Sequence, residues 1–216
     1  EQLAPLLSQI KEKNITVLSN AGGLNLSACR KALMNEAEKA GIDLKIALVI
    51  GDDLMEEFPR LMELGVKEIE TNRPLPDPCL SINAYLGAPG IVAALEQGAD
   101  IIITGRCVDS AMVLAPLIYE FGWTMNDYDL LAAGSLAGHI IECGAQCTGG
   151  NFTDWREVDR FDNMGFPIVE VEPNGQFIVT KPKDTGGMVT FGTIAEQFLY
   201  EIGNPSEYLL PDVICD

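Results

Sequence analysis

The stretch Ile15-Thr-Val-Leu-Ser-Asn-Ala-Gly-Gly-Leu-Asn25 places a short β-branched run directly before a glycine-containing turn. A helical pattern follows from about Leu26 to Ala40, and Gly41 is the residue type that commonly ends a helix. The apolar run Lys45–Ile50 then predicts a second strand. Strand, turn, helix and strand in this order form a βαβ unit, in which the two strands are parallel. The sequence therefore predicts an α/β protein.

The pattern of predicted strands and helices continues to about residue 143, and a glycine-rich segment with a predicted hairpin follows it. The apolar run Asp100–Thr104 predicts a strand buried on both faces. The segments Phe166–Glu172 and Gln176–Thr180 flank Pro-Asn-Gly and predict a β-hairpin. Other helices are predicted over Glu1–Lys13, Leu54–Gly65 (interrupted at Pro59), Gly90–Gln97, Ser110–Phe121, Tyr128–Cys143 and Met188–Glu201. We expect a parallel-sheet core with helices on both faces over residues 1–143. A smaller mixed or antiparallel extension over 144–216 should hold a glycine-rich loop, the hairpin and the last helix.

Composition narrows the classes of partner. The net charge of −18 comes from 32 acidic and 14 basic residues, which disfavours nucleic acid and anionic membrane surfaces. No apolar run approaches the roughly 18 residues of a membrane span, and no signal peptide is apparent. The six cysteines of a core-rich chain indicate reduced thiols and a cytoplasmic protein. The opening helix, which lacks an initiator methionine, predicts an excerpt of a longer protein. A homo-oligomer is compatible with these features.

Glycine-rich loops after the strands are the candidate ligand-binding segments, because α/β sheets bind ligands at the carboxyl ends of their strands. In the first turn, the backbone of Asn20, Gly22, Gly23 and Asn25 could cradle an anion at a helix N-terminus. The alternative is a tight turn with Asn25 as the helix cap.

Two further loops belong to the same prediction. Gly105 and Arg106 follow the buried strand and Ser110 begins a helix, so Arg106 is placed to bind a carboxylate or phosphate. Alternatively, Arg106 pairs with Asp109, the expected cap of that helix, and only stabilises the turn. The third loop, Thr148 to Trp155, offers the residues Gly149, Gly150 and Asn151.

The candidate catalytic residues are Asp109, His139 and Glu142. His139 is the only histidine and lies three residues before Glu142, which predicts a pair able to move a proton. The alternative is a histidine packed on a helix face. Asp52 and Asp53 follow the second strand, where paired carboxylates could bind a divalent metal. Zinc is disfavoured, because Gly144 should end the helix between His139 and Cys147.

Three long motifs carry a family resemblance. They are Ser81-Ile-Asn-Ala-Tyr-Leu-Gly-Ala-Pro-Gly-Ile-Val-Ala-Ala-Leu95, Ala99-Asp-Ile-Ile-Ile-Thr-Gly-Arg-Cys-Val-Asp-Ser-Ala111 and Leu131-Ala-Ala-Gly-Ser-Leu-Ala-Gly-His-Ile-Ile-Glu-Cys-Gly-Ala-Gln-Cys-Thr-Gly-Gly-Asn-Phe-Thr-Asp-Trp155. Together they resemble the acyclic terpene utilisation family, the AtuA-like proteins. Members of that family also carry an opening glycine-containing segment that has no counterpart in this chain.

The resemblance implies a role in the breakdown of branched acyclic terpenoids through CoA thioesters. It supplies no catalytic residues, so the site candidates rest on the loop argument. The leading hypothesis is an enzyme of the lyase, hydratase or isomerase type that acts on an acyl-CoA or a small carboxylate. The alternative is a non-catalytic subunit that binds an intermediate or a partner enzyme. The sequence identifies no cofactor, although a divalent metal is compatible with it.

Overall fold

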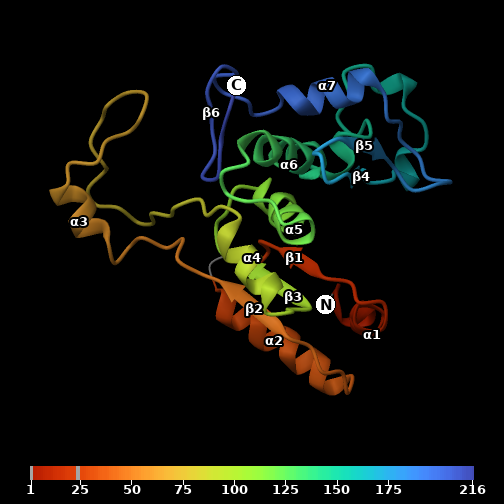
Figure 1. The fold of residues 1–216 in the computed structure, drawn as a ribbon, viewed down its shortest axis with the longest axis horizontal. Coiled ribbons are helices and arrows are strands. Elements are labelled where there is room, and N and C mark those ends of the chain that lie inside the picture. Colours follow the sequence, from red (N-terminus) through yellow and green to blue (C-terminus); the bar gives the residue numbers. More distant parts are fainter. Residues whose placement is uncertain (1, 23–24) are drawn as a thin grey trace. The chain divides into compact units, whose positions relative to one another are not determined.

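The computed structural model describes residues 2–22 and 25–216, and it confirms the α/β class (Figure 1). The chain forms two compact units, the first comprising Glu1–Leu86 with Glu96–Cys107 and the second Gly87–Leu95 with Val108–Asp216. The chain thus passes between units near residues 86, 95 and 107, whereas the sequence placed its single boundary at residue 143. Within the described residues, no helix has the length and apolar character needed to span a bilayer.

The first unit is built on a parallel sheet of three strands, as the βαβ pattern predicts. These are β1 (Val17–Ser19), β2 (Ile46–Val49) and β3 (Ile101–Thr104). Their order is β1-β3-β2, so β3 lies between the two strands of the predicted βαβ unit and pairs with both. This central position explains why all four residues of β3 are buried.

Two helices pack on this sheet through a shared apolar cluster. They are α1 (Leu7–Glu12) and α2 (Leu26–Lys39), and the buried residues of the cluster are Leu7, Ile10, Ala37, Ile46, Ile101 and Ile103. The third helix of the unit, α3 (Phe58–Glu63), is shorter than predicted and has Pro59 in its first turn. A proline is tolerated there because the first N–H groups of a helix have no partner within it, so Pro59 lies near the start of the helix and does not interrupt it.

The second unit contains four helices and two small antiparallel sheets. The helices are α4 (Pro89–Glu96), α5 (Ala111–Phe121), α6 (Tyr128–Ile141) and α7 (Phe191–Leu199). The predicted hairpin is confirmed as β4 (Ile168–Val171) paired with β5 (Phe177–Thr180). A second hairpin, β6 (Tyr208–Leu209) with β7 (Ile214–Cys215), was not predicted, because strands of two residues carry no periodic signal.

Helices α5 and α6 approach each other closely at two glycines of α6. A Cβ on Gly138 would lie 2.7 Å from the Cα of Ser110, and a Cβ on Gly134 would lie 2.7 Å from a methyl group of Leu114. Small residues on this side of α6 thus allow the close approach. The two contacts differ in kind, because backbone cannot move aside as a leucine side chain can.

We expect Gly138→Ala to destabilise the protein by about 1–3 kcal/mol, because the added methyl group must push α5 away from α6. Gly134→Ala is the matched control. Its methyl group meets a flexible side chain, and alanine adds up to about 1 kcal/mol of helix propensity. Urea unfolding monitored by circular dichroism measures both variants. Equal loss of stability in the two would contradict the backbone contact.

Candidate functional site

The carboxyl ends of the three parallel strands lie at one edge of the first unit's sheet, where the Asp52 carboxylate holds the loops together. Its Oδ2 accepts hydrogen bonds from the backbone N–H of Arg106 (2.9 Å) and the side-chain amide of Asn83 (3.0 Å). Gly105 is required beside it, because a Cβ at that position would lie 1.9 Å from Asp52 Oδ1. Asp52 thus connects the loop after β2 to the loop after β3.

Asp52 and Asp53, the predicted metal ligands, both accept hydrogen bonds from N–H groups of the protein. Asp53 Oδ1 accepts the backbone N–H of Met55, and its backbone pairs with that of Asn83 in an isolated bridge. Within residues 2–22 and 25–216, no three His, Cys, Asp or Glu side chains form a group that could hold a metal ion. The prediction of a metal at Asp52 and Asp53 therefore gains no support from their surroundings.

The first turn, after β1, combines a helix cap with a close backbone approach. Asn25 Oδ1 accepts the backbone N–H of Ala28, so the predicted cap of α2 is present. A Cβ on Gly22 would lie 2.7 Å from a side-chain carbon of Ile103, which explains the glycine. Asn20 is exposed in this turn, and Gly23 lies outside the described residues. Anion binding by this turn stays a prediction.

The Arg106 guanidinium is the exposed cation of this sheet edge. Its backbone is held on both sides: the N–H donates to Asp52, and the carbonyl accepts the N–H of Leu86 at 3.0 Å. Among the described residues of the first unit, no salt bridge involves Arg106. The Gly105 N–H donates to the carbonyl of Val49, so it is not available to a ligand. The side chain of Arg106 thus remains the group that could bind an anion.

The second unit brings the three predicted catalytic residues together. His139, in the last turn of α6, has its Nδ1 3.4 Å from Glu142 Oε1. On its other side, Glu142 is hydrogen-bonded to the Asp109 carboxyl, which stands just before α5. The close contact of Ser110 with Gly138 explains this meeting, because it carries the residue before Ser110 toward the end of α6. We call Asp109, His139 and Glu142 the acid–base cluster.

The contacts within the cluster shift the pKa of His139 and the pKa of Glu142. The hydrogen bond to Glu142 raises the pKa of His139 above the ordinary imidazole value, although burial opposes the shift. Burial raises the pKa of Glu142, but hydrogen bonds from His139 and Asp109 outweigh it and leave this pKa lowered. A proton shared between two hydrogen-bonded carboxyl groups lies on the one with the higher pKa, and the pKa of Glu142 is the lowered one. The cluster therefore combines a histidine whose pKa is raised, a carboxyl group whose pKa is lowered and a second carboxyl group hydrogen-bonded to it.

Exposure separates the roles within the cluster. The side chains of His139 and Glu142 are only 9% and 11% exposed, whereas Asp109 is exposed. Asp109 was also predicted to cap α5, but the residue at the cap position is Ser110, which is buried. The Asp109 carboxyl is hydrogen-bonded to Glu142. Asp109 is the member that a ligand can reach.

Two residues beside the cluster were not identified from the sequence. Gln197 is fully buried and its Nε2 donates to the backbone carbonyl of His139 at 2.7 Å. Burial, followed by the charges of Glu142 and Glu201, raises the pKa of Tyr208, so its hydroxyl stays protonated. Neither residue lies in a recognisable motif, and both come from the C-terminal part of the chain. No sequence signal linked them to His139.

In the third predicted loop, the backbone N–H groups of both glycines already donate hydrogen bonds to carbonyl groups of the preceding turn. The N–H of Gly150 donates to the carbonyl of Ala145 (2.7 Å), and that of Gly149 donates to Gln146 (3.0 Å). The proposed backbone contacts of Gly149 and Gly150 with a ligand are therefore unavailable in this conformation, while Asn151 is exposed.

The nearby thiols are unreactive. Burial raises the pKa of Cys147 to about 11 and also raises that of Cys143, so both stay protonated near neutral pH. A nucleophile or a soft-metal ligand requires a thiolate.

Comparison with known proteins identifies one family. The model of the family described as acyclic terpene utilisation family protein AtuA matches residues 1–216, the whole chain. No curated protein and no solved structure matches.

The role of Asp52 can be measured through stability. Asp52→Ala should lower the free energy of unfolding by about 1–3 kcal/mol, because it leaves the N–H groups of Arg106 and Asn83 without their acceptor. Arg106→Ala removes an exposed side chain and should change stability by less than about 1 kcal/mol. Thermal and urea unfolding compare the two. A destabilising Arg106→Ala would show that the guanidinium stabilises the loop.

The pKa of His139 can be read directly by NMR, since the chain has one histidine. We expect it to titrate above 6.5, the ordinary value, and to move down in Glu142→Gln. Glu170→Gln, at an exposed position of β4, is the control and should leave it unchanged. Because the folded pKa of His139 is raised, the contribution of its charged form to stability is full below pH 6.5, as long as Glu142 is ionised, and is lost as pH rises through the folded pKa. An unchanged titration in Glu142→Gln would show that the pair does not form.

Proposed function

The chain belongs to the acyclic terpene utilisation family, and we propose that it is an enzyme of terpenoid breakdown that uses acid–base chemistry on a branched acyl-CoA or a related small carboxylate. The observation that carries the proposal is the acid–base cluster, in which the exposed carboxyl group of Asp109 adjoins the buried His139–Glu142 pair. Buried proton-transfer groups with opposed pKa shifts are typical of catalytic sites. Family membership supports the substrate class of the proposal, and the cluster supports its kind of reaction.

The proposed chemistry uses Asp109 as the group that exchanges protons with the substrate. Isomerisation of a double bond beside a thioester carbonyl removes one proton from carbon and returns one to another carbon; hydration adds a proton and a hydroxyl group across the bond. Both need a group that can give and retake a proton. In its protonated form Asp109 gives a proton to one carbon of the substrate, and the carboxylate that results lies beside Glu142, whose negative charge a protonated His139 offsets. A second proton then returns to Asp109, from another carbon of the substrate in isomerisation or from the added water in hydration.

Several features are consistent with this assignment. The raised pKa keeps the hydroxyl of Tyr208 neutral, so it can donate a hydrogen bond to a developing oxyanion. The protonated thiols of Cys143 and Cys147 favour acid–base over thiolate chemistry. These features support a lyase, hydratase or isomerase type of reaction.

The alternative is a non-catalytic subunit that binds an intermediate or assembles with a partner enzyme. The exposed apolar side of α7, where Phe191 is 91% exposed, favours it, since exposed aromatic side chains are typical of association surfaces. This alternative predicts that thioesters bind and raise the melting temperature without being converted.

Deuterium exchange tests the proposal without knowledge of the product. The protein is incubated in D2O with branched unsaturated acyl-CoA thioesters, and deuterium entering the acyl chain is followed by mass spectrometry. We expect incorporation by the wild type and a rate lowered about 10²- to 10⁴-fold in Asp109→Asn. Glu170→Gln should match the wild type. Full activity of a folded Asp109→Asn would remove Asp109 from the mechanism, and thioester binding without exchange would favour the alternative.

A further inference from the structure

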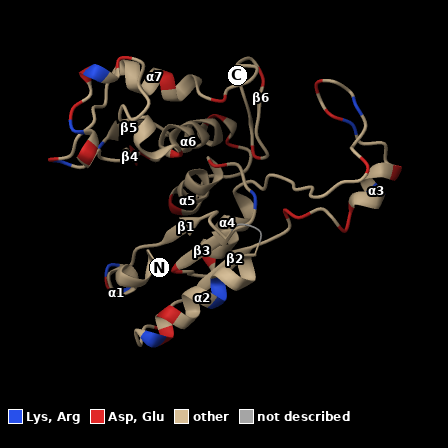
Figure 2. Ribbon diagram, turned by 180° about the vertical axis from the view of Figure 1, so that it is seen from behind, with Lys and Arg blue, Asp and Glu red and all other residues tan. Residues whose placement is uncertain are grey.

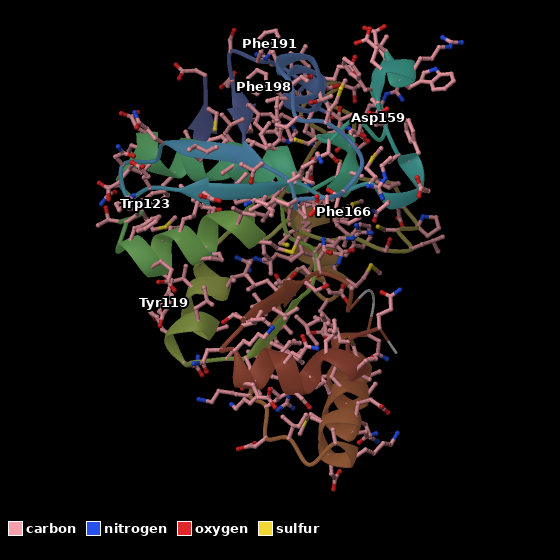
Figure 3. All side chains as sticks on the ribbon, turned by 90° about the vertical axis from the view of Figure 1, so that its right-hand side faces the viewer. Tyr119, Trp123, Asp159, Phe166, Phe191 and Phe198 are labelled. Carbon is pink, nitrogen blue, oxygen red and sulfur yellow. The ribbon has the colours of Figure 1, made fainter. Side chains whose placement is uncertain are left out.

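Helix α7 buries two polar residues and exposes three large apolar ones. Thr193 and Gln197, one turn apart, are 1% and 0% exposed. Phe191, Phe198 and Leu199 are 91%, 47% and 67% exposed. Residues at i, i+7 and i+8 lie along one stripe of a helix, so these three form one apolar face, which we call the α7 face (Figure 3 labels the two phenylalanines). A helix packed only on its own unit would bury this stripe.

The orientation of α7 follows from its polar contacts. The Thr193 and Thr190 side chains each accept the other's backbone N–H, a reciprocal cap that holds the first turn. Gln197 donates to the backbone carbonyl of His139 on α6. The hydrogen bond of Gln197 holds the polar side of the helix against α6. The apolar side is thereby left for a surface other than α6.

The charge on α7 and on the chain that follows it is of one sign. The chain contains no lysine or arginine after Lys183, and its carboxylates from there on are Asp184, Glu196, Glu201, Glu207, Asp212 and Asp216. Figure 2 shows acidic and no basic positions on α7 and the β6–β7 hairpin. Glu201 lies at the C-terminal end of the face, where the hydroxyl of Tyr200 is hydrogen-bonded to it. An apolar stripe with acidic surroundings complements an apolar stripe with basic surroundings.

We propose that the α7 face is a docking surface for a basic amphipathic helix of another protein. Apolar side chains of the partner cover Phe191, Phe198 and Leu199, and its lysines or arginines meet the carboxylates that follow α7. Helices recognised in this way present anchors at i, i+3 or i+4 and i+7. A second copy of this chain fits less well, because it would bring the same carboxylates, and a net charge of −18, against its own kind. The surface is additional to the proposed acid–base site.

The test uses synthetic peptides as probes. One peptide carries leucines along one helical face and lysines along the other, and its twin has glutamates in place of the lysines. Fluorescence anisotropy should show that the lysine peptide binds and the glutamate peptide does not. The double variant Phe191→Ser with Phe198→Ser should weaken binding about tenfold or more, as expected when central aromatic anchors are removed.

A matched variant tests whether the peptide binds the α7 face specifically or any exposed apolar side chain. Ile69→Ser with Leu80→Ser removes side chains that are 80% and 95% exposed in the first unit, and should leave peptide affinity unchanged. Circular dichroism confirms that both double variants fold. The proposal is overturned by equal peptide affinity in the α7 double variant and the wild type. It is also overturned if that variant abolishes a dimer seen by analytical ultracentrifugation, or binding to phosphatidylcholine vesicles, since the occupant would then be a second copy or a membrane.

Discussion

The contact between the backbone of Ser110 and Gly138 is the constraint on which the second unit's chemistry depends. A side chain at position 138 would stand 2.7 Å from Ser110 Cα, so only glycine lets the start of α5 reach α6 at this distance. That approach places Asp109 beside Glu142, which the helix geometry of α6 already places beside His139. Because Gly138 carries no side chain, Asp109 can lie beside the His139–Glu142 pair, and three titratable groups come together.

Carboxylates serve different purposes in the two units. Asp52 accepts hydrogen bonds from the backbone N–H of Arg106 and the side-chain amide of Asn83, and a side chain at Gly105 would clash with its carboxylate. Asp52 therefore joins two loops. Glu142 contacts a histidine, whose pKa it raises, and a second carboxyl group. Because three titratable groups interact there, the proposed proton-transfer chemistry is placed in the second unit.

The acid–base cluster and the α7 face are two consequences of the same helix orientation. Gln197 must point inward to donate its amide to the carbonyl of His139, and this turns Phe198 and Leu199 outward. Reversing the helix would bury the phenylalanine but remove a hydrogen bond behind the histidine. The exposure of the apolar face therefore follows from the way in which α7 supports α6.

The sequence by itself determined the α/β class, the parallel strands, the hairpin at Pro173 and the pairing of His139 with Glu142, because these depend on residues close together in the chain or on a regular period. It also indicated Asp109, both as a helix cap and as a candidate catalytic residue, but not its contact with Glu142. Tertiary structure alone decided that β3 lies between β1 and β2, that Asp52 holds the Arg106 loop, and that Gln197 and Tyr208 lie near the cluster. Each of these relations joins residues that are far apart in sequence, and no local propensity or spacing records which distant segments will pack together.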